Sequence, residues 1–210
     1  MKLPLRLLLA AALLCPVAAW SDAGNFEITP YGAFSAGGKF SDEESDFSAD
    51  LQDSGSFGLI FDFRQTSNTQ WELIYSQQKT DAIVNDAATI DDVLDIDVHY
   101  LQFGGTYQGD GDIFRPYLAA TLGASHFNVR DEGYSSDTFF SFSIGPGLQV
   151  WPNSRVGLRL EARAFGTLVK SGSNLFCVSD PGGGTAGCAV TIAGEILWQV
   201  QAMAGVVIRF

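Results

Sequence analysis

The chain is poor in basic residues and in histidine, and its mature part lacks long apolar runs. Its 210 residues include 12 lysines and arginines against 24 aspartates and glutamates, giving a formal net charge of −12, and two histidines. Because so acidic a protein repels nucleic-acid phosphates, the sequence predicts no nucleic-acid partner. Beyond residue 23 no apolar run approaches the length of about 18 residues that a membrane-spanning helix needs.

The start of the chain is typical of a secretory signal peptide. Lys2 and Arg6 precede an apolar run that ends in small residues near Ala19. We expect residues 1–19 to form the signal peptide, with cleavage as late as residue 23. Residues 24–210 are then one domain of about 190 residues. A membrane anchor is the rival interpretation, and the run is short for one.

The mature chain places apolar residues at every second position, which is typical of strands with two unlike faces. The clearest segment is 195–210, where Trp198 and Ile208 lie on an apolar face and Gln199 and Arg209 on a polar one. Eight such segments occur, and a tilted strand crosses a bilayer with about 9–11 residues. They are 25–37, 55–65, 71–76, 100–107, 114–127, 140–150, 155–168 and 195–210.

The predicted connections alternate in length. An even-stranded barrel with both termini in the periplasm has its odd links outside the cell, where links are long, and its even links short. The sequence therefore predicts an all-β, eight-stranded antiparallel up-and-down transmembrane β-barrel. The odd links span 38–54, 80–94, 128–137 and 170–194, and the even links span 67–69, 108–113 and 152–154.

One stretch departs from the alternation. Leu94, Ile96 and Val98 run in the phase opposite to Leu101 and Phe103. We expect either a β-bulge near His99 or a loss of membrane contact above it.

The alternation does not tell which face points inward, so a soluble barrel or sandwich is the competing fold. The polar rows favour the membrane barrel, because they carry more charge than an apolar core tolerates. Inside a narrow barrel, four acids and four arginines could pair and fill the lumen. The expected interior charge network is Glu27, Asp62, Arg64, Glu72, Arg159, Glu161, Arg163 and Arg209.

Aromatic residues fall near the predicted strand ends, as in the girdles at membrane edges. We expect Trp71, Tyr107 and Phe210 at the periplasmic rim and Trp198 at the outer rim.

Four segments carry a family resemblance. They are YLQFGGTY at 100–107, RPYL at 115–118, GLRLEAR at 157–163 and AGVVIRF at 204–210. Together with the leader, they resemble the small outer-membrane β-barrel superfamily that includes OmpA- and OmpX-like proteins. The resemblance implies the outer membrane of a Gram-negative bacterium as the location.

The end of the chain is similar to the signal by which such barrels are recognised for assembly. The resemblance gives this role to Val206, Ile208 and Phe210. It also implies the barrel-assembly machinery and periplasmic chaperones as partners. In the membrane it implies contact with lipid and lipopolysaccharide, and a monomer.

The function expected is non-enzymatic: a structural or surface role with acidic extracellular loops and a plugged, salt-bridged interior. We expect no catalytic residue, no cofactor and no metal site. Two alternatives stay open, a small-molecule channel of OmpW-like type and a lipid A-modifying enzyme. The enzyme would need a histidine, a nearby serine and a carboxylate, whereas His126 is followed by Phe127 and Asn128.

Cys177 and Cys188 flank a Pro-Gly-rich segment on a link expected outside the cell. In that oxidising compartment the pair predicts a disulfide, which contributes roughly 3 kcal/mol on the loop-entropy estimate.

Overall fold

The computed structural model describes residues 25–41, 48–86, 89–130, 136–169, 177–179, 185–188 and 196–210. The predicted signal peptide lies outside these residues. In the described ranges, no helix is long and apolar enough to cross a membrane. The strands are β1 (Phe26–Ala36), β2 (Lys39–Ser41), β3 (Ser48–Leu51), β4 (Ser54–Arg64), β5 (Thr69–Asp86), β6 (Thr89–Gln108), β7 (Phe114–Val129), β8 (Asp137–Val150), β9 (Val156–Leu168), β10 (Cys177–Ser179), β11 (Thr185–Cys188) and β12 (Ile196–Arg209).

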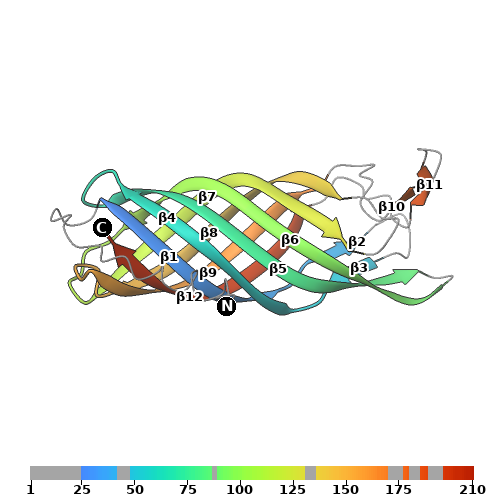
Figure 1. The fold of residues 1–210 in the computed structure, drawn as a ribbon, viewed down its shortest axis with the longest axis horizontal. Coiled ribbons are helices and arrows are strands. Elements are labelled where there is room, and N and C mark those ends of the chain that lie inside the picture. The colour runs from blue at the N-terminus through green and yellow to red at the C-terminus, as the bar shows by residue number, and fades with distance from the viewer. Residues whose placement is uncertain are drawn as a thin grey trace, which may run out of the picture.

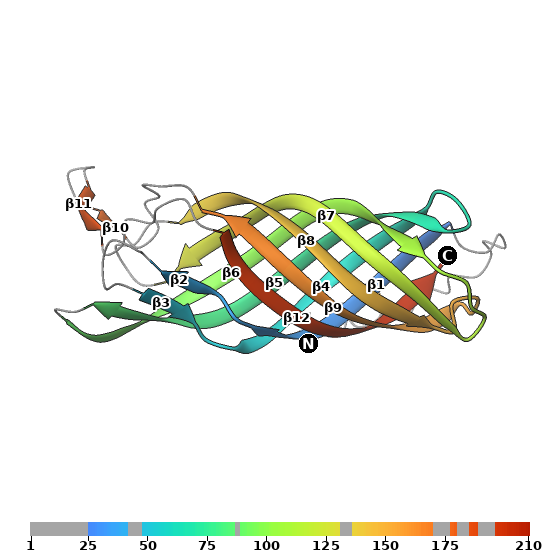
Figure 2. The ribbon, with the colours of Figure 1, turned by 180° about the vertical axis from the view of Figure 1, so that it is seen from behind.

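Ten strands form one sheet, and eight of them close it into an antiparallel barrel in the order β1, β4, β5, β6, β7, β8, β9, β12 (Figure 1). The β5–β6 and β1–β12 pairings complete the ring. Figure 2 shows β12 lying between β9 and β1. Closure leaves no long unpaired edge, which is what allows a sheet to stand in a membrane. The predicted fold class is confirmed.

The two ends of the barrel differ. Short turns join β4 to β5, β6 to β7 and β8 to β9, and they lie at the end where the chain finishes (Figure 1). There the Phe210 amide donates to the Phe26 carbonyl across 3.0 Å and ties the last strand to the first. The strands β2, β3, β10 and β11 belong to the opposite end. This arrangement is the one expected of a barrel with short periplasmic turns.

The structure contradicts the prediction that residues 80–94 form the third connection between strands. β5 continues to Asp86 and β6 begins at Thr89, so most of this range is a long hairpin. Its ladder runs through Ala82 opposite Leu94 and Val84 opposite Asp92 before the register shifts. Apolar β-branched residues in this stretch favour the strand over an open loop.

Of the two explanations given for the phase change near His99, the structure contradicts the β-bulge. β6 pairs without a register shift from Ile96 to Gln108 against β7, and its residues from Ile96 to Tyr107 pair regularly with β5. Ile96 and Val98 point into the barrel and are fully buried, in phase with Tyr100 below them. The phase looked reversed because the interior itself becomes apolar at this end. The outward face becomes polar there instead, with Asp95 exposed.

Large apolar side chains cover the outside of the barrel. This is the reverse of a soluble protein, which buries such residues and exposes polar ones. An apolar exterior around a polar interior is the arrangement of a membrane barrel. Examples that are about half exposed are Phe34, Phe57, Phe63, Leu101, Phe103, Leu122, Phe140, Ile144, Leu160, Trp198 and Val200.

Candidate functional site

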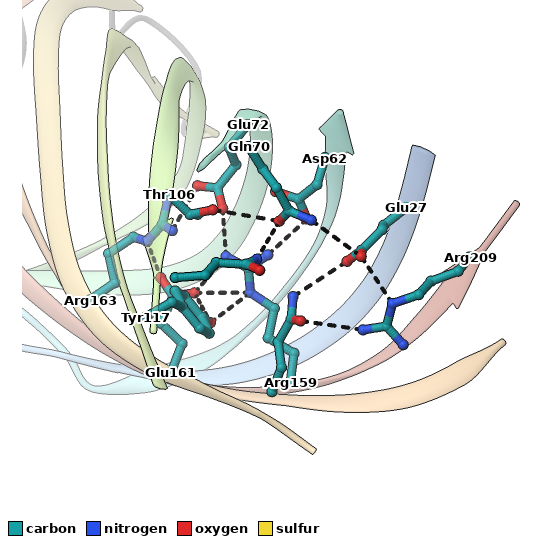
Figure 3. A network of polar contacts seen from close by, with 12 residues as sticks. Glu27, Asp62, Gln70, Glu72, Thr106, Tyr117, Arg159, Glu161, Arg163 and Arg209 are labelled. Carbon is teal, nitrogen blue, oxygen red and sulfur yellow. Dashed lines mark hydrogen bonds and ion pairs between the residues drawn. The ribbon is translucent and has the colours of Figure 1, made fainter. Parts of the chain in front are cut away.

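A buried charge network fills the barrel near its short-turn end, with Arg159 of β9 at its centre (Figure 3). The Arg159 Nη1 atom lies 2.9 Å from Asp62 Oδ2, and Nη2 lies 2.8 Å from Glu161 Oε2. The same Nη2 reaches Glu72 Oε2 at 2.5 Å. One guanidinium therefore contacts carboxylates from three strands, and charge-assisted hydrogen bonds of this kind are the strong ones.

Tyr117 of β7 completes the surroundings of Arg159. The guanidinium carbon lies 4.7 Å from the centre of the Tyr117 ring, and Arg159 Nε donates to the phenol oxygen at 2.7 Å. The phenol in turn donates to Glu161 Oε2 at 2.5 Å. The Arg159 guanidinium thus packs against an aromatic face as well as carboxylates, which suits its planar shape.

Arg163, two inward positions further along β9 and just beyond Glu161, repeats the arrangement. Its Nη2 atom lies 2.7 Å from Glu72 Oε1, and its Nε donates to Glu161 Oε1. Glu72 and Glu161 each bridge Arg159 and Arg163. Both arginines are fully buried, so their charges depend on these partners.

A second, smaller cluster closes the short-turn end of the lumen. Arg209 Nε lies 2.9 Å from Glu27 Oε1, and Arg209 Nη1 donates to the Ser154 carbonyl at 2.8 Å. Gln149 bonds both Arg209 and Glu27, and Gln70 donates to Glu27 Oε1 at 3.2 Å. This cluster links the last strand to a periplasmic turn.

The strand register produces this layout. Glu27, Asp62 and Glu72 are direct cross-strand neighbours on β1, β4 and β5, so three carboxylates form one acidic row inside the wall. The arginines of β9 reach them across the narrow lumen. Asp62 Oδ1 and Arg163 Nη1 are the two charged-group atoms of this network that are buried without a hydrogen-bond partner.

Seven of the eight residues expected in the charge network are thus brought together. Arg64 is the one that is not. It lies at the last position of β4, is partly exposed, and makes no ion pair with any residue the structure describes. The alternation along β4 points Arg64 inward. Its position at the end of the strand places it at the short-turn opening of the barrel, beyond the charge network.

Above the charged layer the interior becomes neutral and then apolar. Thr121 donates to Gln102 Oε1 at 2.8 Å, and Tyr100 donates to Gln199 Oε1 at 2.5 Å. Gln199 continues the layer by donating to Gln78 at 3.2 Å. At the outer end buried apolar side chains occupy the lumen. They are Leu51, Ala82, Ile96, Val98, Phe127, Val129, Phe139, Phe165, Val169 and Leu197.

Sequence reasoning missed this apolar layer and the roles of Tyr117, Gln70 and Gln149. The contrary phase of Ile96 and Val98 was the available signal, since it marks inward apolar residues. The partners of Arg159 carried no signal, because they depend on which strands face one another across the lumen.

The predicted aromatic girdle lies on the outside. Trp71, Tyr107, Trp198 and Phe210 are all at least one-third exposed. Trp71 stacks on Phe103 with ring centres 5.4 Å apart. Val206, Ile208 and Phe210, the expected assembly signal, also point outward on β12.

Both histidines lie on the outside, where the surface turns polar. His126 Nδ1 is 2.8 Å from the Thr138 hydroxyl, and His99 Nδ1 is 2.9 Å from the Tyr75 hydroxyl. A hydrolase of the Ser-His-acid kind needs a carboxylate to orient the base. Within the described part of the chain, no hydrogen bond or ion pair joins a carboxylate to His126.

The two loop cysteines stand opposite each other. Cys177 on β10 pairs in register with Cys188 on β11. Their side chains, and most of the expected acidic loop residues, lie outside what the structure describes.

A closed barrel with lipid-facing apolar strands and a charged lumen defines an outer-membrane β-barrel protein. The family model of the outer membrane protein beta-barrel domain matches residues 7–192, so the chain belongs to this family. The family and fold place it in the outer membrane. No curated protein matches the chain significantly.

Solved structures with a similar fold include two small barrels. Neisserial surface protein A has a TM-score of 0.58 and 15% identity, over 90% of this chain and 100% of its own. The outer membrane protein OprG from Pseudomonas aeruginosa has a TM-score of 0.56 and 16% identity, over 90% and 96%. At these identities the likeness concerns the fold.

Proposed function

We propose that the protein is a non-enzymatic, non-conducting outer-membrane barrel with a structural and surface role. Its salt-bridged interior plugs the axis, and its longer outer links present acidic side chains. Export through a cleaved signal peptide, assembly by the barrel-assembly machinery with periplasmic chaperones, contact with lipopolysaccharide and a monomeric state belong to this proposal.

The observation that carries the proposal is the position of Arg159. Its guanidinium lies in the lumen and bonds Asp62, Glu72 and Glu161 on three strands. An eight-stranded barrel is only wide enough for side chains. The apolar layer above, centred on residues such as Phe127 and Phe165, adds a second barrier to ions.

Planar bilayers test the plug. The folded protein should give no stepwise conductance, while its heat-modifiable gel mobility reports an intact barrel. Regular unitary steps from the unmodified protein would refute the plug. A matched comparison uses a variant carrying Arg159→Ala and Phe165→Ala, which removes one residue from each barrier. Conductance by that variant and not by the unmodified protein supports a lumen closed by these side chains.

A small-molecule path through the wall is the second candidate. A depression of about 530 Å³ opens on the lipid side over β8, β9 and β12, and its lining includes Pro146, Ala162, Ala202 and Ala204. The β8–β9 ladder skips Gly145 and Pro146. On the inner side a Cβ atom at Gly147 would lie 2.0 Å from Tyr117, so that ring covers the wall from within.

Liposome uptake distinguishes the two candidates. The plug predicts that small apolar solutes enter barrel-containing liposomes no faster than empty ones. A wall path predicts faster entry, and Ala162→Leu, which fills the depression from outside, should abolish the gain. Ala120→Leu on β7, at another outward position, is the control.

A further inference from the structure

Two histidines on neighbouring strands form a pair at the outer rim that the function above does not use. His99 of β6 and His126 of β7 are direct cross-strand partners, and their ring centres lie 6.4 Å apart. Both are partly exposed on the outward face. Gln77 and Thr138 continue the same row on β5 and β8.

Hydroxyl groups hold both rings by the same nitrogen. Tyr75 contacts His99 Nδ1 at 2.9 Å, and Thr138 contacts His126 Nδ1 at 2.8 Å. The Nε2 atoms of both rings have no hydrogen-bond partner among the described residues. A hydroxyl oxygen can accept from Nδ1–H, and this tautomer leaves the Nε2 lone pair available. Metal-binding histidines are commonly oriented in this way through their other ring nitrogen.

We propose that His99 and His126 bind one divalent transition-metal ion, of the Cu²⁺, Ni²⁺ or Zn²⁺ class, through their Nε2 atoms. Imidazole suits these ions. Bonds of about 2.0–2.1 Å from each ring let one ion bridge them after small side-chain rotations. The other coordination positions are open to water, because the described chain offers no third His, Cys, Asp or Glu that completes a group.

The nearest charged side chains do not compete for this role. Asp97, one outward position above His99, faces Arg130 Nε at 3.6 Å. Asp95 faces Arg130 Nη2 at 3.7 Å. The His99–His126 pair therefore presents two nitrogen donors, which Ca²⁺ and Mg²⁺ avoid in favour of oxygen. The sequence does not reveal this pair, because the pairing depends on the register of β6 against β7.

Calorimetric titration of the untagged, folded barrel in detergent tests the proposal, with excess Ca²⁺ occupying carboxylates and iodoacetamide blocking free thiols. One Cu²⁺ ion should bind per barrel, more tightly than Ni²⁺ or Zn²⁺, as the general order of affinities requires. His99→Gln and His126→Gln should each weaken binding roughly tenfold or more, since each removes one of two ligands. Asp97→Asn is the matched control and should leave the affinity unchanged.

Electron paramagnetic resonance of the Cu²⁺-loaded protein counts the nitrogens independently. Two nitrogen ligands in the unmodified protein and one in each histidine variant support the site. Heat-modifiable mobility checks that each variant is folded. Binding that survives in both histidine variants, or that excess Ca²⁺ abolishes, would overturn the proposal. The absence of saturable Cu²⁺ binding would overturn it as well.

Discussion

Arg159 on β9 and Asp62 on β4 are 97 residues apart in the chain, yet their Nη1 and Oδ2 atoms lie 2.9 Å apart inside the barrel. The same guanidinium also bonds Glu72 and Glu161. Removing it takes the ion-pair partner from Asp62 and leaves Glu72 and Glu161 with Arg163 alone. Breaking a buried pair in this way costs far more than the pair itself contributes.

Arg159→Met should therefore lower the free energy of unfolding by about 3–5 kcal/mol. Urea unfolding in lipid vesicles, followed by tryptophan fluorescence, measures the loss. Arg64→Met is the matched control, because Arg64 is partly exposed and outside the network, and it should change stability by about 0.5 kcal/mol or less. Equal losses in the two variants would contradict the central role of Arg159.

The acids of the network should differ in importance. Glu72 uses both oxygens, one toward Arg163 and one toward Arg159. Asp62 uses one oxygen, and it stands between Glu27 and Glu72 in the acidic row. Neutralising Asp62 relieves two repulsions and weakens one ion pair, whereas neutralising Glu72 relieves one repulsion and weakens two ion pairs.

The expected cost is about 3 kcal/mol for Glu72→Gln and less than about 1 kcal/mol for Asp62→Asn. The same urea experiment gives both values. An Asp62→Asn variant as unstable as Glu72→Gln would mean that the acidic row does not repel itself.

The sequence predicts the fold well because strand parity is a local property. Each apolar residue at an outward position, such as Leu101 or Phe103, can be recognised from its neighbours alone. The charged interior residues follow from the same parity. The ion-pair partners of these residues do not follow from parity. Arg159 contacts Glu72 only because the eight strands close with one particular register. Height along the barrel is also non-local, which is why the sequence does not place Arg64 at the short-turn opening or Ile96 inside the apolar outer layer.

Gly147 is a test of the inner wall. A Cβ atom there would lie 2.0 Å from Tyr117 Cζ, so Gly147→Ala must displace the ring that bonds Glu161. We expect a loss of about 1–3 kcal/mol, the usual cost of overpacking. Gly55→Ala is the control, because nothing lies within 4 Å of a Cβ atom at Gly55. Urea unfolding should show Gly55→Ala unchanged or slightly more stable. A neutral Gly147→Ala would show that Tyr117 is loosely held.

The outer end of the β5–β6 hairpin should respond to pH. Asp81 stands opposite Asp95 in the ladder, above the level where the outward face turns polar. The hydrogen bond from this pairing raises the pKa of Asp81, burial and the charge of Asp95 act in the same direction, and Arg130 opposes them. The folded hairpin thus holds the proton more tightly than the unfolded chain.

Asp81 therefore contributes stability to this hairpin end at acidic pH, and that contribution is lost as the pH rises through its raised pKa. Amide exchange at residues 80–84, measured by NMR across that pH range, should show protection falling with rising pH. Asp81→Asn should remove the dependence. A pH profile unchanged by Asp81→Asn would assign the effect to other groups.

The outer loop should carry a disulfide between Cys177 and Cys188. Residues directly opposite in an antiparallel pair have Cα atoms about 4.5–5.5 Å apart, which falls inside the range of about 4.4–6.8 Å that a disulfide spans. Mass spectrometry of the mature protein should find neither cysteine alkylated before reduction and both alkylated after it. Cys188→Ser should expose Cys177 to the reagent. Because the bridge joins two loop strands outside the closed ring, that variant should keep the heat-modifiable mobility of the barrel. Free thiols in the unreduced mature protein would contradict the bridge.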